Sequence, residues 1–265
     1  MKRQKNRINI LLHIFNIVVT VIMIAPLLLI ILTSFTPEAY NTIPTSEWSL
    51  RWYQAISKSP GFINGFILSC ALAAIAGVIS LIIGFLAAFV MVRYDFKGKF
   101  LADAFFMAPL AVPSVALGIA LLQLFVKINL FNTFFGLLAA HVVVTVPYLI
   151  KTAGVSLRAV SKDMELAAMN LGATWFQAFT HITMPLIKQG LISGYIFAFL
   201  VSFGEVAVTL FIIGPTYQTL PVRIFGYLID QSTPLIASIS SLLILFSVAL
   251  MIILDRLFGL KSIIN

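Results

Sequence analysis

The sequence predicts an all-α integral membrane protein with six spanning helices. Hydrophobic residues make up 61% of its 265 residues and charged residues only 10%, whereas soluble domains carry about 25% charge. With a mean hydropathy of +1.07, the chain has too little polar surface to cover a globule in water. Six apolar segments reach the roughly 20 residues that a helix needs to cross a bilayer. Because lipid offers the backbone no hydrogen bonds, we expect these segments to be helical.

The predicted spans follow the apolar runs in order. They are residues 10–32, 63–92, 102–126, 134–155, 190–213 and 235–258. The first follows a basic start, residues 1–9, and exceeds the roughly 7–15 apolar residues of a signal peptide, so we expect a retained helix that serves as signal anchor. In the third, Pro109 and Pro113 predict a kink. A transmembrane domain over 10–258 and a C-terminal tail over 259–265 complete the division.

Basic residues predict the orientation of the spans. The loops 1–9, 93–100, 156–188 and 259–265, with the helix ends beside them, hold most of the 17 Lys and Arg residues. The loops of the other side hold Arg51, Lys58, Lys127 and Arg223. The positive-inside rule therefore puts both termini and the loop 156–188 in the cytoplasm. The net charge of +8 then reflects membrane topology, and it gives no reason to expect nucleic acid as a partner.

The outer loop between the first and second spans is aromatic. Trp48, Trp52 and Tyr53 lie near Arg51. This composition favours an interfacial helix anchored by aromatic rings. A dock for an extracytoplasmic partner is the alternative, and the sequence leaves both open.

The loop between the fourth and fifth spans contains a patterned polar stretch, residues 161–185. Asp163 and Glu165 lie where the first turn of a short amphipathic helix would favour anions. Gly172 is a helix stop, because glycine tolerates positive φ. Thr174 is placed to cap a second short helix, and Pro185 suits the first turn of the fifth span, where a missing N–H does no harm. We therefore expect a cytoplasmic helix–turn–helix that inserts into a groove of a partner.

This stretch resembles the EAA motif of permease subunits of binding-protein-dependent ABC importers. The motif reads Glu-Ala-Ala, three residues, Gly, nine residues, Ile, one residue, Leu-Pro. The matching positions are Ala167, Ala168, Gly172, Ile182 and Pro185. Leu166 stands at the glutamate position, with Glu165 one residue earlier, and Met184 stands at the leucine position. The adjacent alanines would let another backbone approach closely, and the contact is expected to depend on shape more than on the family's ion pair.

The resemblance implies a type I importer permease whose coupling helix, in the loop 156–188, sits in a groove of an ATP-binding subunit. Two permeases, here expected to differ, and two ATPases would form the complex, with an extracytoplasmic binding protein delivering the substrate across the bacterial inner membrane. The sequence contains no Walker-type Gly-rich loop, so this chain needs no cofactor of its own, and ATP and Mg²⁺ belong to the ATPase. ATPase closure would switch the permeases between inward- and outward-facing states.

The sequence also bears on the substrate. Residues 204–230 and 237–254 resemble the second permease of the branch that imports spermidine/putrescine, 2-aminoethylphosphonate or ferric iron; a polyamine is our first expectation. Glu205 is an acid inside the fifth apolar run, where a carboxylate marks a functional site by default. Ser202, Glu205 and Thr209 would share one helical face and line the pathway for a cationic substrate. The alternative is a protonated Glu205 that hydrogen-bonds between helices as packing.

Two other function classes are weighed against an importer subunit. A membrane hydrolase would need a convergent Ser/His/Asp set or a metal cluster, and three scattered histidines and few intramembrane acids argue against it. A proton-coupled secondary carrier usually has more intramembrane ionisable groups and internal repeats. Co-purification with an ATPase distinguishes the importer subunit from both.

Overall fold

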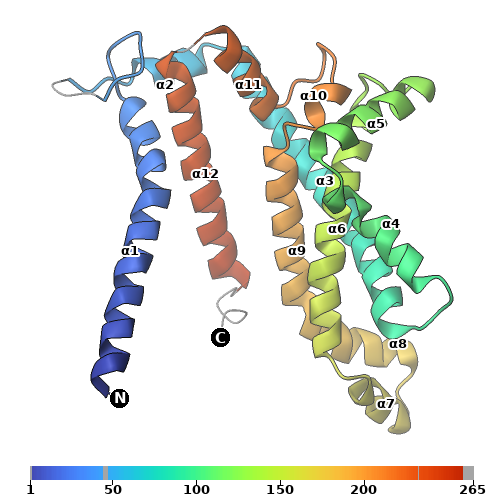
Figure 1. The fold of residues 1–265 in the computed structure, drawn as a ribbon. Helices are drawn as coiled ribbons and strands as arrows, with labels where there is room; N and C mark the ends of the chain where they lie inside the picture. The colour runs from blue at the N-terminus through green and yellow to red at the C-terminus, as the bar shows by residue number, and fades with distance from the viewer. Residues whose placement is uncertain (1, 44–46, 232, 259–265) are drawn as a thin grey trace. The chain divides into compact units, whose positions relative to one another are not determined.

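The computed structural model describes residues 2–43, 47–231 and 233–258, and every regular element within those ranges is a helix (Figure 1). The elements are α1 (Lys2–Thr33), α2 (Arg51–Ser57), α3 (Pro60–Arg93), α4 (Lys99–Ala111), α5 (Ser114–Lys127), α6 (Phe134–Ala159), α7 (Lys162–Asn170), α8 (Trp175–Ala178), the π-helix η1 (Phe179–Thr183), α9 (Met184–Gly204), α10 (Thr209–Ile212), α11 (Leu220–Asp230) and α12 (Pro234–Phe258). The predicted tail over 259–265 lies outside the described residues.

The described chain contains five helices that are long and apolar enough to cross a membrane. They are Leu12–Thr33, Pro60–Arg93, Phe134–Ala159, Trp175–Gly204 and Pro234–Ile253. A sixth span results if α4 and α5 are counted together. The first, second, fourth and sixth predicted spans are confirmed as helices, and the third and fifth need correction.

The third predicted span is broken. α4 and α5 meet at an angle of 109°, on either side of Val112 and Pro113. Val112 is extended, with φ −89° and ψ 135°, because the ring of a proline disfavours helical backbone in the residue before it. Pro113 also has no N–H to continue the hydrogen bonds of α4. The prediction of a single kinked helix over 102–126 is therefore wrong, because the chain forms two helices there. The break does lie at Pro113, one of the two prolines that predicted a kink.

The fifth predicted span is displaced along the chain. A helix of 30 residues runs from Trp175 through η1 to Gly204, where we expected 190–213. Glu205 is extended, with φ −72° and ψ 119°, and α10 begins only at Thr209. Apart from Glu205, the residues on both sides of this break are mainly apolar, so the hydropathy pattern does not mark the end of the helix.

The chain divides into two compact units, one holding the residues up to Ile63 with Gly226–Met251, the other holding Asn64–Phe225 with the residues from Ile252 on. In the first unit, hydroxyl groups join the end of α1 to α2 and α12. The Tyr53 hydroxyl lies 2.6 Å from Ser34 Oγ and 2.7 Å from Ser241 Oγ, and the Trp52 indole donates to the Thr36 carbonyl over 3.1 Å. The aromatic outer loop thus contains the expected helix, α2, and these two rings bond to their own unit.

In the second unit, α6 is the central helix, in contact with α4, α9 and α10. Its buried apolar side chains form one cluster with α3 and α9 and another with α5 and α10. The first cluster is Ala88, Val146, Ile150, Ala153, Leu157, Val160 and Ile187. The second is Leu121, Phe125, Ala140, Val208 and Ile212.

Small residues bring α6 and α9 close together. A Cβ added to Gly190 would overlap Ser156 Oγ, and one added to Gly194 would overlap Thr152 Oγ1. Helices in membranes associate through such small-residue contacts, because lipid provides no hydrophobic driving force between them. This packing holds α9 against α6, the central helix of the unit, and so positions residues 161–183, which lie between the two helices in the sequence.

Candidate functional site

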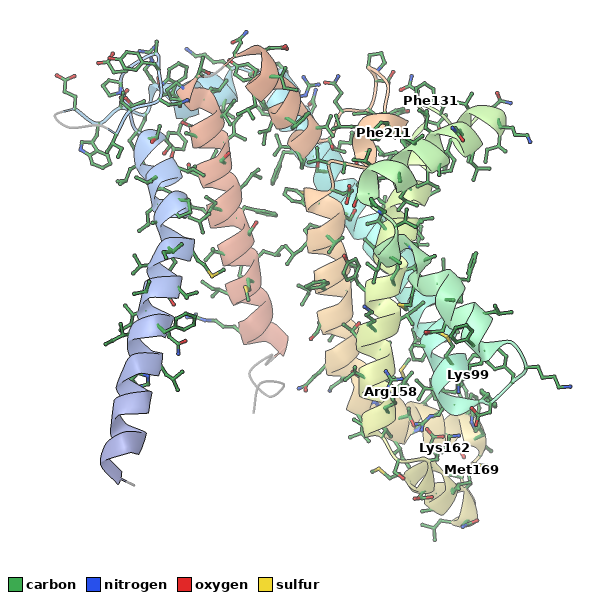
Figure 2. All side chains as sticks on the ribbon, in the orientation of Figure 1. Lys99, Phe131, Arg158, Lys162, Met169 and Phe211 are labelled. Carbon is green, nitrogen blue, oxygen red and sulfur yellow. The ribbon has the colours of Figure 1, made fainter. Side chains whose placement is uncertain are left out.

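The candidate site is the α7–η1 region, residues 161–183, which follows α6 and precedes α9. Ser161 caps α7 by accepting a hydrogen bond from the Asp163 N–H over 3.2 Å, and Asp163 and Glu165 lie in the first turn. Figure 2 shows Lys162 and Met169 of α7 at one end of this unit and Phe131 and Phe211 at the other. The predicted short helix with an acidic first turn is confirmed.

The end of α7 is a Schellman motif built on Gly172. Gly172 has φ +96°, a conformation that glycine adopts without steric strain. The Ala173 N–H donates to the Ala168 carbonyl over 3.1 Å, and the Gly172 N–H donates to the Met169 carbonyl over 3.0 Å. These two bonds satisfy carbonyls that a helix end otherwise leaves free. Gly172 therefore stops the helix as predicted.

The chain then turns into a helix that continues across the unit. Thr174 and Gln177 form a capping box, each side chain bonding the other residue's backbone N–H. The π-helix η1 follows, with the Met184 N–H donating to the Phe179 carbonyl five residues back. Pro185, in the first turn of α9, has no N–H and cannot bond four residues back, and the wider π turn accommodates this. The second short helix is thus continuous with the fifth span.

The motif residues divide between an exposed face and a groove. Leu166 is 54% exposed and Leu171 is 91% exposed. Ala167 and Pro185 are also exposed. Ala168 and Ile182, two of the motif positions, line a shallow groove of about 360 Å³ between α7 and the α8–η1 helix. The exposed apolar side chains and the adjacent small residues suit a contact with another protein chain.

Glu165 is turned into the unit. It is 9% exposed, and its Oε1 accepts a hydrogen bond from Arg93 Nη2 over 2.9 Å and another from the Thr183 hydroxyl. Arg93 lies at the end of α3 and is equally buried. Arg93 Nη1 donates to the Val160 carbonyl over 3.1 Å, and Lys162 Nζ donates to the Arg93 carbonyl over 2.7 Å.

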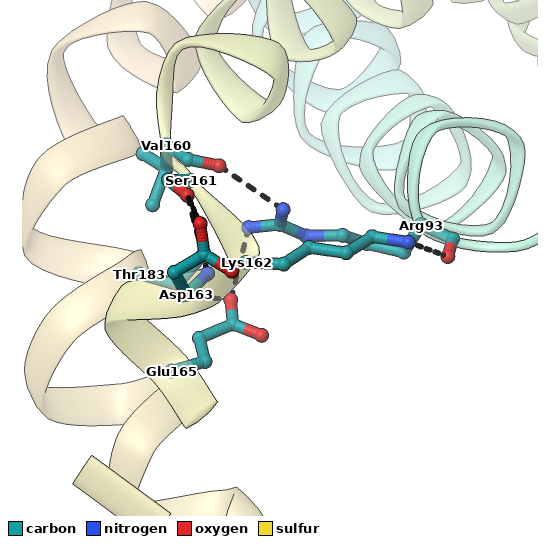
Figure 3. Close-up of polar contacts among 7 residues, drawn as sticks. All are labelled: Arg93, Val160, Ser161, Lys162, Asp163, Glu165 and Thr183. Atoms are coloured by element: carbon teal, nitrogen blue, oxygen red, sulfur yellow. Dashed lines mark hydrogen bonds and ion pairs between the residues drawn. The ribbon is translucent and has the colours of Figure 1, made fainter. Parts of the chain in front are cut away.

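We call Arg93, Lys162, Glu165 and Thr183 the Arg93 cluster (Figure 3). It joins the end of α3, the start of α7 and the end of η1. Sequence reasoning missed this role of Arg93, which it counted only as a topology charge. In the adjoining α3–α4 loop, the hydrogen bond and positive charge of Lys99 lower the pKa of the exposed Asp95 carboxyl.

Aromatic rings make a second contact between the α8–η1 helix and α3. Trp175 and Phe179 stack with centroids 5.4 Å apart. The Phe89 ring of α3 meets Phe179 edge-on at 5.5 Å and Trp175 at 6.3 Å. Such arrangements contribute beyond simple burial. The candidate site is therefore fixed to α3 at two separate places.

The three predicted pathway residues do not share a helical face, because α9 ends before Glu205. Ser202 and Thr209 are buried and bond the two ring nitrogens of His141, at 2.8 Å from Nδ1 and 3.1 Å from Nε2. The prediction of one continuous polar stripe is therefore wrong. Glu205 is half-buried, and its Oε1 accepts a hydrogen bond from the Val208 N–H over 2.8 Å. Its role in a pathway stays a prediction.

Comparison with known proteins places this geometry in a family. Residues 80–260 match the family described as binding-protein-dependent transport system inner membrane component. The chain belongs to this family. It is therefore a multi-pass inner-membrane permease subunit of an importer, as the EAA-like motif indicated, with the all-α fold of type I ABC importer permeases.

Several individual proteins are similar over most of the chain. The spermidine/putrescine transport system permease protein PotC of Haemophilus influenzae is 29% identical over 94% of this chain and 96% of its own length. The putrescine transport system permease protein PotI of Escherichia coli is 32% identical over 83% of this chain and 80% of its own. A chain from the crystal structure of a bacterial alginate ABC transporter, in complex with an alginate pentasaccharide-bound periplasmic protein, superposes with a TM-score of 0.73 at 13% identity, covering 98% of this chain and 96% of the other.

Proposed function

We propose that this chain forms, with a second and different permease, the translocation pathway for a polyamine such as spermidine or putrescine. The observation that carries the substrate class is the resemblance to two permeases named for polyamine transport, each over at least four fifths of this chain. An extracytoplasmic binding protein delivers the polyamine. Both termini and the α7–η1 region lie in the cytoplasm, as the distribution of Lys and Arg favours.

The power for transport comes from a separate ATP-binding subunit that contacts α7. The exposed Leu166 and Leu171 and the groove beside Ala168 support this role. ATP and Mg²⁺ bind to that subunit, since the sequence of this chain has no Walker-type loop. The contact relies on apolar and small side chains, because Glu165 is held inside the unit by Arg93.

Glu205 is our candidate for the acid that meets the cationic substrate. One of its oxygens bonds the Val208 N–H, and the carboxylate keeps further acceptor capacity for an ammonium group. Glu205 directly follows the span Trp175–Gly204, and an acid beside an apolar span is a candidate for a substrate site. Ser202 and Thr209, bound to His141, then act as supports for the break between α9 and α10.

The experiment is uptake by the purified complex. The tagged chain is purified from membranes with the subunits that accompany it, reconstituted in liposomes with ATP and Mg²⁺ on the cytoplasmic face, and given the binding protein with labelled spermidine or putrescine outside. ATP-dependent accumulation of either polyamine is expected. Lack of an accompanying ATPase, or uptake by the chain alone, contradicts the importer role, and ATP-driven uptake of a different solute contradicts the substrate.

The role of Glu205 is tested in the same uptake assay by comparing two variants with the unaltered chain. Glu205→Gln keeps an oxygen for the Val208 N–H and removes the charge. We expect uptake to fall with expression and assembly unchanged, while Glu38→Gln, at an exposed loop acid, leaves uptake at the level of the unaltered chain. Undiminished uptake by Glu205→Gln would refute the pathway role.

A further inference from the structure

The Arg93 cluster contains a buried ion pair between the end of α3 and the first turn of α7. Arg93 and Glu165 are each 9% exposed, and removing ionised groups from water is unfavourable unless each is paired. The Arg93 guanidinium satisfies this by bonding both Glu165 and the Val160 carbonyl. Thr183 adds a second donor to the same carboxylate oxygen.

The cluster connects positions far apart in the sequence. Glu165 follows Arg93 by 72 residues, and Thr183 follows Glu165 by 18. The Arg93 end of α3 is thereby bonded to the first turn of α7 and to the helix that continues into α9. The edge-on contacts of the Phe89 ring with Phe179 and Trp175 attach the α8–η1 helix to α3 at a second place.

The position of the acid within the motif explains how it comes to face inward. Successive residues of a helix are separated by about 100° around its axis. With Leu166 at the motif's glutamate position and the acid one residue earlier, the carboxylate points into the unit while Leu166 is 54% exposed. The acid of this motif thus bonds within the chain, and the apolar Leu166 is exposed in its place.

We propose that Arg93 is a positioning residue for coupling, holding α7 so that a displacement of α7 by the ATP-binding subunit moves α3 and α9 with it. This inference rests on the proposed function, since it assumes that an ATPase acts on α7. Two spanning helices then respond to one contact at Leu166 and Leu171. Without the Arg93–Glu165 pair, α7 can shift against α3, and hydrolysis proceeds with less transport.

The experiment measures polyamine transported per ATP hydrolysed in the reconstituted complex. The unaltered chain is tested first, and failure of its ATP-dependent uptake would count against the proposed function alone. We then expect Arg93→Met to keep the ATPase bound and hydrolysing while the transported amount per ATP falls at least tenfold. Arg158→Met removes an exposed cation from the last turn of α6, and it should keep the amount transported per ATP of the unaltered chain. An unchanged ratio in Arg93→Met would overturn the inference.

A second design covers the case in which Arg93→Met does not fold. In a Cys70→Ala background, Arg93→Cys and Glu165→Cys are combined and then bridged with a reversible bifunctional thiol reagent of matched length. If α7 and α3 move as one body, bridging restores the transport per ATP that the unbridged pair has lost, and reduction removes it again. Failure of the bridge to restore the ratio, or loss of transport on bridging, would show that α7 must move against α3 and would overturn the inference.

Discussion

Replacing Gly172 by alanine should weaken the contact between this chain and its ATP-binding subunit without disturbing the packing of α7. Gly172 has φ +96°, and a Cβ added there would meet no atom within 4 Å. The effect is therefore confined to the backbone, where a left-handed conformation costs an L-residue about 1–2 kcal/mol. Alanine also favours continuing the helix, so part of the population loses the Schellman ending and the groove beside it.

The expected size follows from this free energy. If the native end of α7 becomes less favourable by about 1–2 kcal/mol, the apparent affinity for the ATPase falls by at most a factor of about 5–30, the limit reached when the alternative ending predominates. The assay is a titration of the purified ATP-binding subunit against the chain in nanodiscs. Asparagine, which tolerates positive φ better than alanine, should give a smaller loss at the same position.

Gly98 provides a matched control for this prediction. It has φ +89° and likewise meets no atom within 4 Å, but it lies before α4 and outside the α7–η1 region. Gly98→Ala should carry a backbone cost similar to that of Gly172→Ala, about 1–2 kcal/mol, seen as lower thermal stability. It should leave the affinity for the ATPase unchanged. Equal loss of affinity in Gly98→Ala and Gly172→Ala, or full affinity in Gly172→Ala, would refute the reasoning.

Three further substitutions test the packing that supports the site. Gly190→Ala should overpack the contact between α6 and α9, lower the free energy of unfolding by about 1–3 kcal/mol and so lower the midpoint of thermal unfolding in detergent. Ser156→Gly in the same chain should recover much of this stability. No loss in the single variant would contradict the close approach of α6 and α9. His141→Leu should lower the same midpoint because it leaves the buried Ser202 hydroxyl without its partner, at about 1–3 kcal/mol, while the Thr209 hydroxyl keeps its bond to the Glu205 carbonyl. His181→Leu, at an exposed ring, should not lower it, and equal effects would count against the buried network. Thr174→Ala should remove the capping box at a cost of about 1 kcal/mol, seen as faster amide hydrogen exchange at the start of α8; unchanged exchange would show that the cap contributes little.

The spans that the sequence predicted well are those whose ends coincide with changes in composition. α3 and α12 end close to the expected residues, because polar or charged residues flank their apolar runs. The break after Gly204 could not be predicted in this way, since Val206 and Val208 keep the run apolar. His141 holds that break by bonding Ser202 before it and Thr209 after it, and a hydropathy pattern contains no information on such a partner.

The candidate site shows the same division between local and long-range information. Ser161, Thr174 and Gly172 act on their own neighbours, and residue type alone predicted the short helix and its ending. The role of Arg93 depends on a carboxylate 72 residues later, so one sequence could show only that a cation lies near a helix end. The inward direction of Glu165 likewise depends on its contact with Arg93 of α3, which the local sequence around Glu165 does not contain.

The π-helical turn at Phe179–Thr183 has a consequence for how such permeases can vary. A π turn holds one residue more than the α-helical turn that it replaces, and it is equivalent to a one-residue insertion. Deleting that residue would rotate the α7–α8 segment by about 100° about the axis of α9 and draw it closer by about 1.5 Å. α9 itself would keep its length and sequence, while a different face of the segment would be presented to the ATPase. Single-residue insertions or deletions here are thus a route by which a permease and its ATPase can acquire a new mutual register.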